Sequence, residues 1–203
     1  MDTTKTLAII GKSGHGKVIA DIAYLNGYQH ILWIDDDGSK NLPNIEDFLQ
    51  NYAHLPAVIA IGNNTIRKTI YTKLKAHNIT LPTLIHPSAV ISPSALIQEA
   101  CVVMPLVVVN ADAKVSEGVI LNSASVIEHD NIIEAFTHIS PNVALAGNVH
   151  IKTLTHIGIG CNVIQGISIG TQCIIAAGSS VITNIPDSVM AAGTPAKIKK
   201  ELK

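Results

Sequence analysis

The sequence predicts a two-part fold, in which an α/β domain with a parallel sheet precedes a parallel β-helix. Three observations predict it. Residues 1–84 alternate short aliphatic runs with segments of helical periodicity. From residue 91 to residue 181, every sixth residue is Ile, Leu or Val. Aromatic residues make up 3% of the chain, and beyond residue 85 only Phe136 is aromatic.

Residues 1–84 are predicted to form a Rossmann-like α/β domain. Strands are expected where aliphatic runs end at glycine, aspartate or asparagine, which happens at residues 6–10, 31–34 and 57–61. Helices are expected where apolar residues recur at helical spacing, in residues 17–26, 44–50 and 66–77. Residues 83–85 are a further candidate strand. This alternation is typical of a parallel sheet with helices on its faces.

A six-residue repeat fills the second part, predicted as a domain over residues 85–190 with a tail at 191–203. All sixteen positions from Ile91 to Val181 in steps of six are aliphatic, and the residue two places before each next one is mostly small or β-branched. In a β-helix each hexad gives one strand and one turn, and three hexads complete a triangular coil about 4.8 Å tall. About five coils are therefore expected, with the aliphatic residues inside a prism too narrow for aromatic rings.

Composition and the lengths of the apolar runs exclude several classes of protein. The chain has 14 basic and 15 acidic residues, so it lacks the excess of positive charge that nucleic-acid binding requires. Only 14% of residues are charged and 47% are hydrophobic, which predicts extensive burial or oligomerisation. No apolar run reaches the roughly 18 residues of a membrane span. The run from Leu7 to Ile10, after Met1 to Lys5, is too short for a signal peptide. A cytoplasmic protein is expected.

A glycine-rich segment, Gly11 to Lys17, follows the first predicted strand and opens the first helix. Glycines let backbone amides approach a phosphate, and a helix N-terminus attracts an anion. A P-loop would need Ser or Thr where Val18 stands, and a dinucleotide fingerprint would need glycine in place of Ser13. A plain strand-to-helix turn is the alternative.

Polar residues also follow the second and third predicted strands. Asp35 and Asp36 lie about 20 residues past the glycine segment, where acidic groups commonly hold a ribose or base. Gly62 and Asn63 follow the third strand. Ligands of parallel α/β sheets bind beyond the carboxyl ends of the strands, so all three segments are expected at one edge. For the aspartates, a solvated turn is the alternative.

His129 is the predicted general base. It lies two places after the inward Ile127, so its side chain is expected to point outward. Its ordinary pKa suits proton transfer near neutral pH, and Asp130 could orient the ring. A surface histidine without function is the alternative. His138 also points outward, and His156 is expected to stack on it in the next coil.

Residues 91–185 and the closing Gly193-Thr194-Pro195-Ala196-Lys197 resemble the hexapeptide-repeat, left-handed β-helix acyltransferases. With the glycine segment and Ile61 to Asn64, the whole chain resembles the nucleotide-sugar N-acetyltransferases that make diacetylated bacillosamine. Sialic acid O-acetyltransferases and perosamine N-acetyltransferases are similar. The resemblance implies acetyl-CoA as cosubstrate, a UDP-linked 4-amino-4,6-dideoxy sugar as acceptor, and a homotrimer with sites between neighbouring subunits.

The resemblance also implies roles for single residues. His129 would deprotonate the sugar amine beside Asp130, where the family has Glu. Backbone amides near Gly147 could stabilise the oxyanion. The substrate-binding residues, which include those at the sheet edge, are predicted to be Ser13, Gly14, His15, Asp35, Asp36, Gly62, Asn63 and Asn122. The residues that contact acetyl-CoA are predicted to be His138, Gly147, Ile157, Ala177, Gly178 and Lys197. For Asn122, an ordinary turn residue is the alternative.

No metal site is predicted. The histidines at positions 129, 138, 150 and 156 lack the His-x4-His pair of zinc-binding β-helix enzymes, and the three cysteines fall at small inward positions of the hexads. Two rival functions stay open. One is acetylation of a sialic acid hydroxyl or of GDP-perosamine, and the other is a β-helix that serves only as a scaffold.

Overall fold

The computed structural model describes residues 5–202, apart from the side chain of Lys40. The first four residues of the predicted first domain and the last residue of the predicted tail lie outside the described residues. The α/β part has a parallel sheet in the order β2-β1-β3, made of β1 (Thr6–Ile10), β2 (His30–Ile34) and β3 (Ala57–Ile59). Its helices are α1 (Gly14–Leu25), α2 (Ile45–Asn51) and α3 (Asn64–Ala76), with a short 3-10 turn at Gly38–Lys40.

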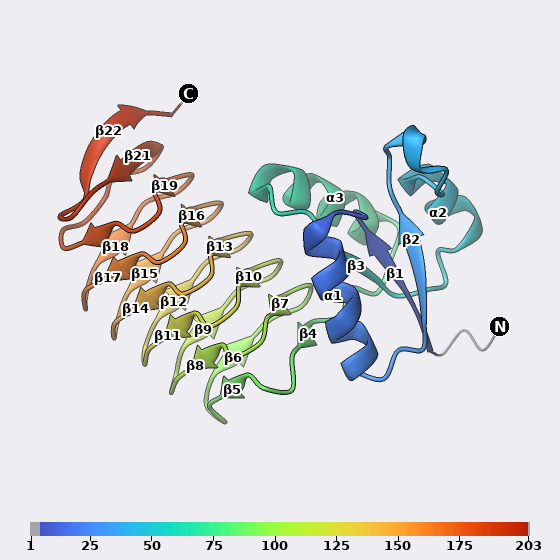
Figure 1. Cartoon of the computed structure of the whole chain (residues 1–203), viewed down its shortest axis with the longest axis horizontal. Coiled ribbons are helices and arrows are strands. Elements are labelled where there is room, and N and C mark those ends of the chain that lie inside the picture. The colour runs from blue at the N-terminus through green and yellow to red at the C-terminus, as the bar shows by residue number, and fades with distance from the viewer. Residues whose placement is uncertain (1–4, 203) are drawn as a thin grey trace.

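The sheet separates two cores, because alternate residues of the buried strand β1 point to opposite faces. Leu7 and Ile9 pack with α1 in a core that continues into the β-helix. Ala8 and Ile10 pack in a second core with Phe48 of α2 and Leu74 of α3. Helix α1 therefore lies between the sheet and the coils, as Figure 1 shows. The predicted alternation of strands and helices is confirmed.

Residues 84–201 form a left-handed parallel β-helix with three faces. Face 1 holds β4 (Leu84–Ile85), β7 (Val102–Val103), β10 (Ile120–Leu121), β13 (His138–Ile139), β16 (His156–Ile157), β19 (Ile174–Ile175), β21 (Val189–Ala192) and β22 (Lys197–Glu201). Face 2 holds β5 (Val90–Ile91), β8 (Val108–Val109), β11 (Val126–Ile127), β14 (Ala144–Leu145), β17 (Asn162–Val163) and β20 (Ser180–Val181). Face 3 holds β6 (Leu96–Ile97), β9 (Lys114–Val115), β12 (Ile132–Ile133), β15 (His150–Ile151) and β18 (Ser168–Ile169). Figure 1 shows the coils stacked from β4, beside α1, to the β21–β22 hairpin.

The hexad prediction is confirmed strand by strand. Each predicted inward aliphatic is the second residue of one of the strands β5 to β20. From Ile91 to Val163, each pairs with its counterpart eighteen residues on, as Ile139 does with Ile157. One expectation is wrong. The strand expected at 83–85 does not join the α/β sheet: β4 pairs with β7, so Ile85 opens the ladder one hexad earlier.

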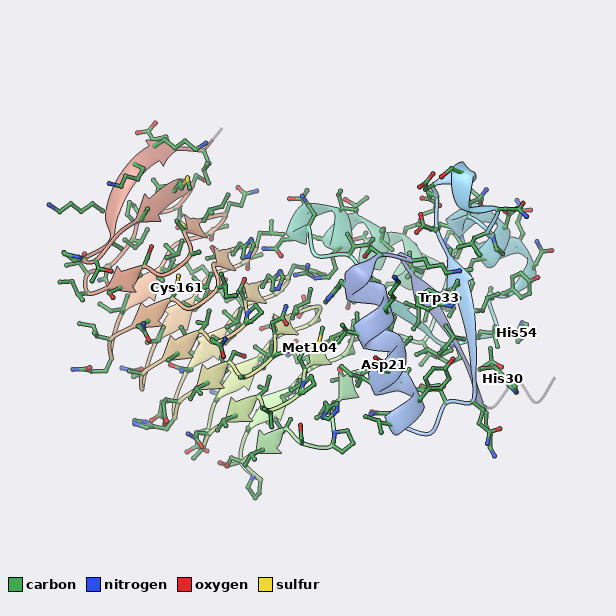
Figure 2. The ribbon with its side chains drawn as sticks, in the orientation of Figure 1. Asp21, His30, Trp33, His54, Met104 and Cys161 are labelled. Atoms are coloured by element: carbon green, nitrogen blue, oxygen red, sulfur yellow. The ribbon has the colours of Figure 1, made fainter. Side chains whose placement is uncertain are left out.

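Residues 191–203 were expected to be a tail, and most of them are in a hairpin. Strand β22 runs antiparallel to β21, with Ala192 opposite Lys197. All three cysteines are buried and free, and Figure 2 shows Cys161 among the coils and Trp33 in the α/β part. Within residues 5–202, no helix is long and apolar enough to cross a membrane. The domain boundary between residues 84 and 85 stays a prediction.

From Ala100 to Gly178, every sixth residue lies in a turn of the β-helix and adopts the left-handed backbone region. At the corner between faces 2 and 3 (corner 2–3) one of these residues is Asp130, with φ 61°. Aspartate, asparagine and glycine tolerate this region, so the turn alone accounts for an Asp there. At the corner between faces 3 and 1 (corner 3–1) the residue is Phe136, with φ 57°. A bulky side chain rarely adopts such a conformation, so neighbouring contacts hold it there.

Candidate active site

The glycine segment lies where the sequence predicts it, at the carboxyl edge of the sheet. Ser13 is the N-cap of α1, but its side chain makes no capping hydrogen bond. A cavity of about 290 Å³ opens at this edge. Its lining is Ile10, Gly11, Ser13, Asp35, Asp36, Ile45, Ile61, Ile66 and Ile70. Of the predicted substrate-binding residues, Ser13, Asp35 and Asp36 are thus brought together around one pocket.

The carboxylates of both aspartates in this pocket accept hydrogen bonds from nearby backbone N–H groups. The Lys12 N–H donates to Asp35 Oδ2 at 2.8 Å, and the Asp37 N–H donates to Asp35 Oδ1 at 3.0 Å. The Ile45 N–H donates to Asp36 Oδ1 at 2.9 Å. Asp35 therefore ties the glycine segment to the end of β2. A carboxylate oxygen can accept more than one hydrogen bond, so both carboxylates can still accept one from a ligand.

Gly62 and Asn63 line a second cavity of about 330 Å³, between the start of α3 and face 1. The Asn63 side chain caps α3 by accepting a hydrogen bond from the Ile66 N–H at 3.0 Å. The other lining residues are Asn64, Thr65, Leu154, His156, Gln172, Cys173, Ile174, Ser188 and Leu202. Gly62 and Asn63 therefore face the β-helix, and neither of them lines the pocket at the sheet edge.

Two histidines of face 1 form what we call the histidine stack. The rings of His138 and His156 lie parallel, with centroids 4.8 Å apart and an interplanar angle of 2°. The ring of His15 approaches that of His138, with centroids 6.4 Å apart. Asn122 Nδ2 lies 3.2 Å from His138 Nε2, and Ser140 Oγ lies 2.9 Å from His156 Nε2. Two predicted substrate-binding residues, His15 and Asn122, thus meet at a predicted cofactor residue.

These histidines are uncharged at neutral pH. Burial lowers the pKa of His15 to about 4, and the positive charge of Arg67 adds to the effect. Burial also lowers the pKa of His138 to about 3, with further contributions from His156 and Arg67. His15 Nε2 is buried, and residues 5–202 offer it no hydrogen-bond partner. A neutral imidazole can accept a hydrogen bond, so the cluster suits a ligand that donates one.

His129 lies at corner 2–3, with its side chain 62% exposed. Its Nδ1 is 2.8 Å from Asp130 Oδ2, and this hydrogen bond raises the pKa of His129. The ring lies against Gly147 in the next coil, so closely that a Cβ there would be 2.5 Å from His129 Nε2. Glycine at position 147 is therefore what leaves room for the ring. No group within residues 5–202 accepts from the Gly147 N–H, so that donor is free for a ligand.

The predicted base and the predicted nucleotide pocket lie on opposite sides of the prism. His129 is at corner 2–3, which is opposite face 1, and face 1 carries the histidine stack next to the α/β part. His129 and His138 are nine residues apart in the sequence, which is half of an eighteen-residue coil. One chain alone therefore does not bring His129 to His138.

The predicted cofactor residues are similarly divided. Gly147 shares the corner of His129, whereas Ala177 and Gly178 are exposed at the corner between faces 1 and 2 (corner 1–2). Lys197 is exposed at the start of β22. The side chain of Ile157 is fully buried on the inner ladder. Ile157 can therefore offer a ligand only its backbone.

No sequence motif singles out Arg67, which is 1% exposed and lies at the junction of the two parts. Burial lowers its pKa to about 10, and it stays charged at neutral pH. Within residues 5–202, no group of three or more His, Cys, Asp or Glu could hold a metal ion.

Known proteins resemble both parts of the chain. Residues 6–74 match the sequence family described as the PglD N-terminal domain. UDP-N-acetylbacillosamine N-acetyltransferase of Bacillus subtilis is 37% identical over 111 residues, which are 49% of this chain and 51% of that protein. The chain thus spans about half the length of this curated relative.

Two solved structures match nearly the whole chain. The acetyltransferase domain of PglB from Neisseria gonorrhoeae, in complex with acetyl-CoA, is 38% identical and has a TM-score of 0.90; the match covers 96% of this chain and 99% of that one. PerB from Caulobacter crescentus, in complex with CoA and GDP-perosamine, is 35% identical with a TM-score of 0.91, and 96% and 97% of the two chains are covered. The chain belongs to the PglD-like family of hexapeptide-repeat sugar N-acetyltransferases.

Proposed function

We propose that the protein transfers the acetyl group of acetyl-CoA to the 4-amino group of a UDP-linked 4-amino-4,6-dideoxy-N-acetylhexosamine. The observation that carries the proposal is the whole-chain likeness to an acetyltransferase domain solved with acetyl-CoA, joined to the match with a bacillosamine N-acetyltransferase. The local features agree with it. The chain combines a pocket at the sheet edge, a neutral histidine cluster and an exposed His–Asp pair.

In this proposal the α/β part binds the nucleotide. Ser13, Gly14 and His15, at the N-terminus of α1, hold the diphosphate, because backbone amides and the helix dipole favour an anion there. Asp35 and Asp36 accept hydrogen bonds from the uridine. Gly62, Asn63 and Asn122 line the path of the sugar toward the β-helix, where the second cavity supplies the space.

The chemistry is a direct transfer with no acyl-enzyme. His129 Nε2 takes a proton from the amine as its nitrogen attacks the thioester carbonyl, and Asp130 stabilises the resulting imidazolium. The Gly147 N–H stabilises the oxyanion. The tetrahedral intermediate then collapses, the C–S bond breaks, and the imidazolium returns its proton to the CoA thiolate. A cysteine nucleophile is disfavoured because all three thiols are buried and burial raises the pKa of each.

A homotrimer is part of the proposal, because His129 and the nucleotide pocket lie on opposite sides of one β-helix. A neighbouring subunit that places its corner 2–3 beside face 1 would complete the site. Acetyl-CoA would then lie between the two prisms, against His138, Gly147, Ala177, Gly178, Lys197 and the backbone of Ile157. We place the enzyme in the cytoplasm, where acetyl-CoA and nucleotide sugars are made.

A second acceptor is favoured by one observation. PerB, solved with GDP-perosamine, matches this chain over nearly its whole length at 35% identity. GDP-perosamine also carries a 4-amino group on a dideoxy sugar, so the same base and the same groove would serve it. Only the nucleotide pocket would need to differ.

Release of CoA thiol from acetyl-CoA tests the acceptor. The panel consists of UDP-4-amino-4,6-dideoxy-N-acetylglucosamine, GDP-perosamine and free sialic acid. We expect turnover with the first compound and much less with the other two. Turnover with GDP-perosamine alone would move the assignment to the second candidate. Silence with all three, in a protein that binds CoA, would refute the proposed acceptor class.

A further inference from the structure

Arg67 is a buried cation, and its hydrogen-bond partners in the described part of the chain are all uncharged. Its guanidinium makes six hydrogen bonds of 2.7–3.3 Å. The acceptors are the carbonyl oxygens of Ile61, Gly62, Gly118, Phe136 and Thr137 and the side-chain oxygen of Asn64. Within residues 5–202, no other donor reaches the carbonyls of Ile61, Gly118 and Phe136.

These acceptors come from both parts of the molecule. Ile61 and Gly62 follow β3 and lie next to the glycine segment, since a Cβ on Gly11 would lie 2.7 Å from the Ile61 side chain. Gly118 and Phe136 occupy corner 3–1 in two successive coils. Asn64 extends the junction to a third coil, where its Nδ2 donates to Leu154 O at 2.9 Å and to Thr155 O at 3.1 Å.

The corner is shaped to receive the guanidinium. Phe136 has a left-handed backbone and packs edge-on against Tyr71 of α3, with ring centroids 5.1 Å apart. Gly118 leaves room for the Phe136 ring, because a Cβ there would lie 2.4 Å from it. Apolar residues could join two surfaces without the cost of desolvating a charge. A buried cation that bonds to both parts of the molecule therefore calls for a role beyond holding two surfaces together.

The charge of Arg67 also acts on the histidines nearby. After burial, it is among the causes that lower the pKa of His15 on α1 and of His138 and His156 on face 1. The other titratable group coupled to it is the Cys101 thiol, whose pKa burial raises to about 12, so that it is neutral. Among the described residues, no carboxylate accepts a hydrogen bond from Arg67, so its field at the cluster stays positive.

We infer that Arg67 is a positioning residue of the acetyl-transfer site, whose fork of hydrogen bonds sets where the glycine segment and His15 lie relative to the histidine stack. Its effect on turnover rests on the proposed function, whereas its effect on the histidines does not. Lysine at this position would keep the charge but could not span acceptors from both parts. Methionine would remove the charge as well.

The test compares Arg67→Lys, Arg67→Met and the control Lys68→Met, an exposed neighbour on the same helix. The binding of UDP and of CoA is measured by calorimetry, turnover by thiol release, and histidine titration by NMR. We expect both Arg67 variants to keep UDP and CoA affinities within about two-fold and to lose about 10²-fold in kcat. In the methionine variant, the pKa values of His15 and His138 should rise; in the lysine variant they should stay low.

The inference would be overturned if both Arg67 variants kept a kcat within about two-fold of the parent's. So would an unchanged histidine titration in Arg67→Met. Loss of UDP and CoA binding together with kcat would show a general folding role instead. If Arg67→Met does not fold, Arg67→Lys decides through its kcat. If the parent acetylates none of the acceptors, the proposed function fails, and the histidine titration still decides the role of Arg67.

Discussion

Gly147→Ala isolates the position of the His129 ring from the rest of the molecule. An ideal Cβ at Gly147 would lie 2.5 Å from both Cε1 and Nε2 of His129. Carbon atoms in contact are about 3.5–4.0 Å apart, so the ring must move by about 1 Å. The backbone of Gly147 is not among those with positive φ, so the substitution adds no backbone strain.

The expected cost falls on catalysis and not on stability. A displacement of about 1 Å at a reacting group can cost about 10²-fold in rate. The His129 side chain is 62% exposed, so it can swing into solvent without disturbing the coils. The free energy of unfolding should change by less than about 0.5 kcal/mol. We therefore expect kcat/KM to fall about 10²-fold while urea denaturation stays close to that of the parent.

Gly27→Ala is the matched control, which is expected to lower stability and leave catalysis unchanged. Gly27 has φ +92° with open space around its missing Cβ, and it lies after α1, away from the proposed site. Alanine there should cost about 1 kcal/mol of stability through backbone strain, with kcat/KM unchanged. If Gly147→Ala keeps the parent's kcat/KM, then His129 does not act from its place against Gly147, and the assignment of the base is refuted.

Three further predictions concern protonation and packing. Asp130→Asn replaces the carboxylate, whose hydrogen bond and charge raise the pKa of His129, with a neutral amide, so the acidic limb of the kcat/KM profile should move to lower pH. Burial lowers the pKa of His138 from 6.5 to about 3, so the unfolded chain takes up this proton first as the pH falls. The free energy of unfolding should therefore decline from pH 6.5 toward pH 3, and urea denaturation of His138→Gln at several pH values should show a flatter decline. Ile133→Ala, on the inner ladder, should lower the free energy of unfolding in urea by about 2–5 kcal/mol. Ile132→Ala, where the side chain is 40% exposed, should lower it by less than about 1 kcal/mol.

The β-helix could be predicted in detail because its signal is periodic. An inward aliphatic every six residues fixes both the strand and the face to which each residue belongs. The sheet to which β4 belongs could not be predicted, because a two-residue strand at a junction fits either neighbour. The same register places Ile157 inside the prism, so its buried side chain follows from the sequence.

The candidate site could be predicted only in pieces. The carboxyl-edge rule brings Ser13, Asp35 and Asp36 to one pocket. The contact of His15 with His138 joins residues far apart in the sequence and depends on how the two parts dock. At that junction Arg67 bonds to both parts, and five of its six acceptors are backbone carbonyls. Backbone carbonyls leave no pattern of residue types, so the sequence could not single out Arg67.

The most direct test of the central claim is the rate of acetyl transfer by His129→Ala, measured as thiol release with the preferred acceptor. The variant should lose about 10²–10⁴-fold in kcat and recover part of it when imidazole is added. Its affinity for CoA should be unchanged, because the exposed ring supports no other part of the fold. A variant that transfers acetyl groups at the parent's rate would contradict the assignment of His129 as the general base.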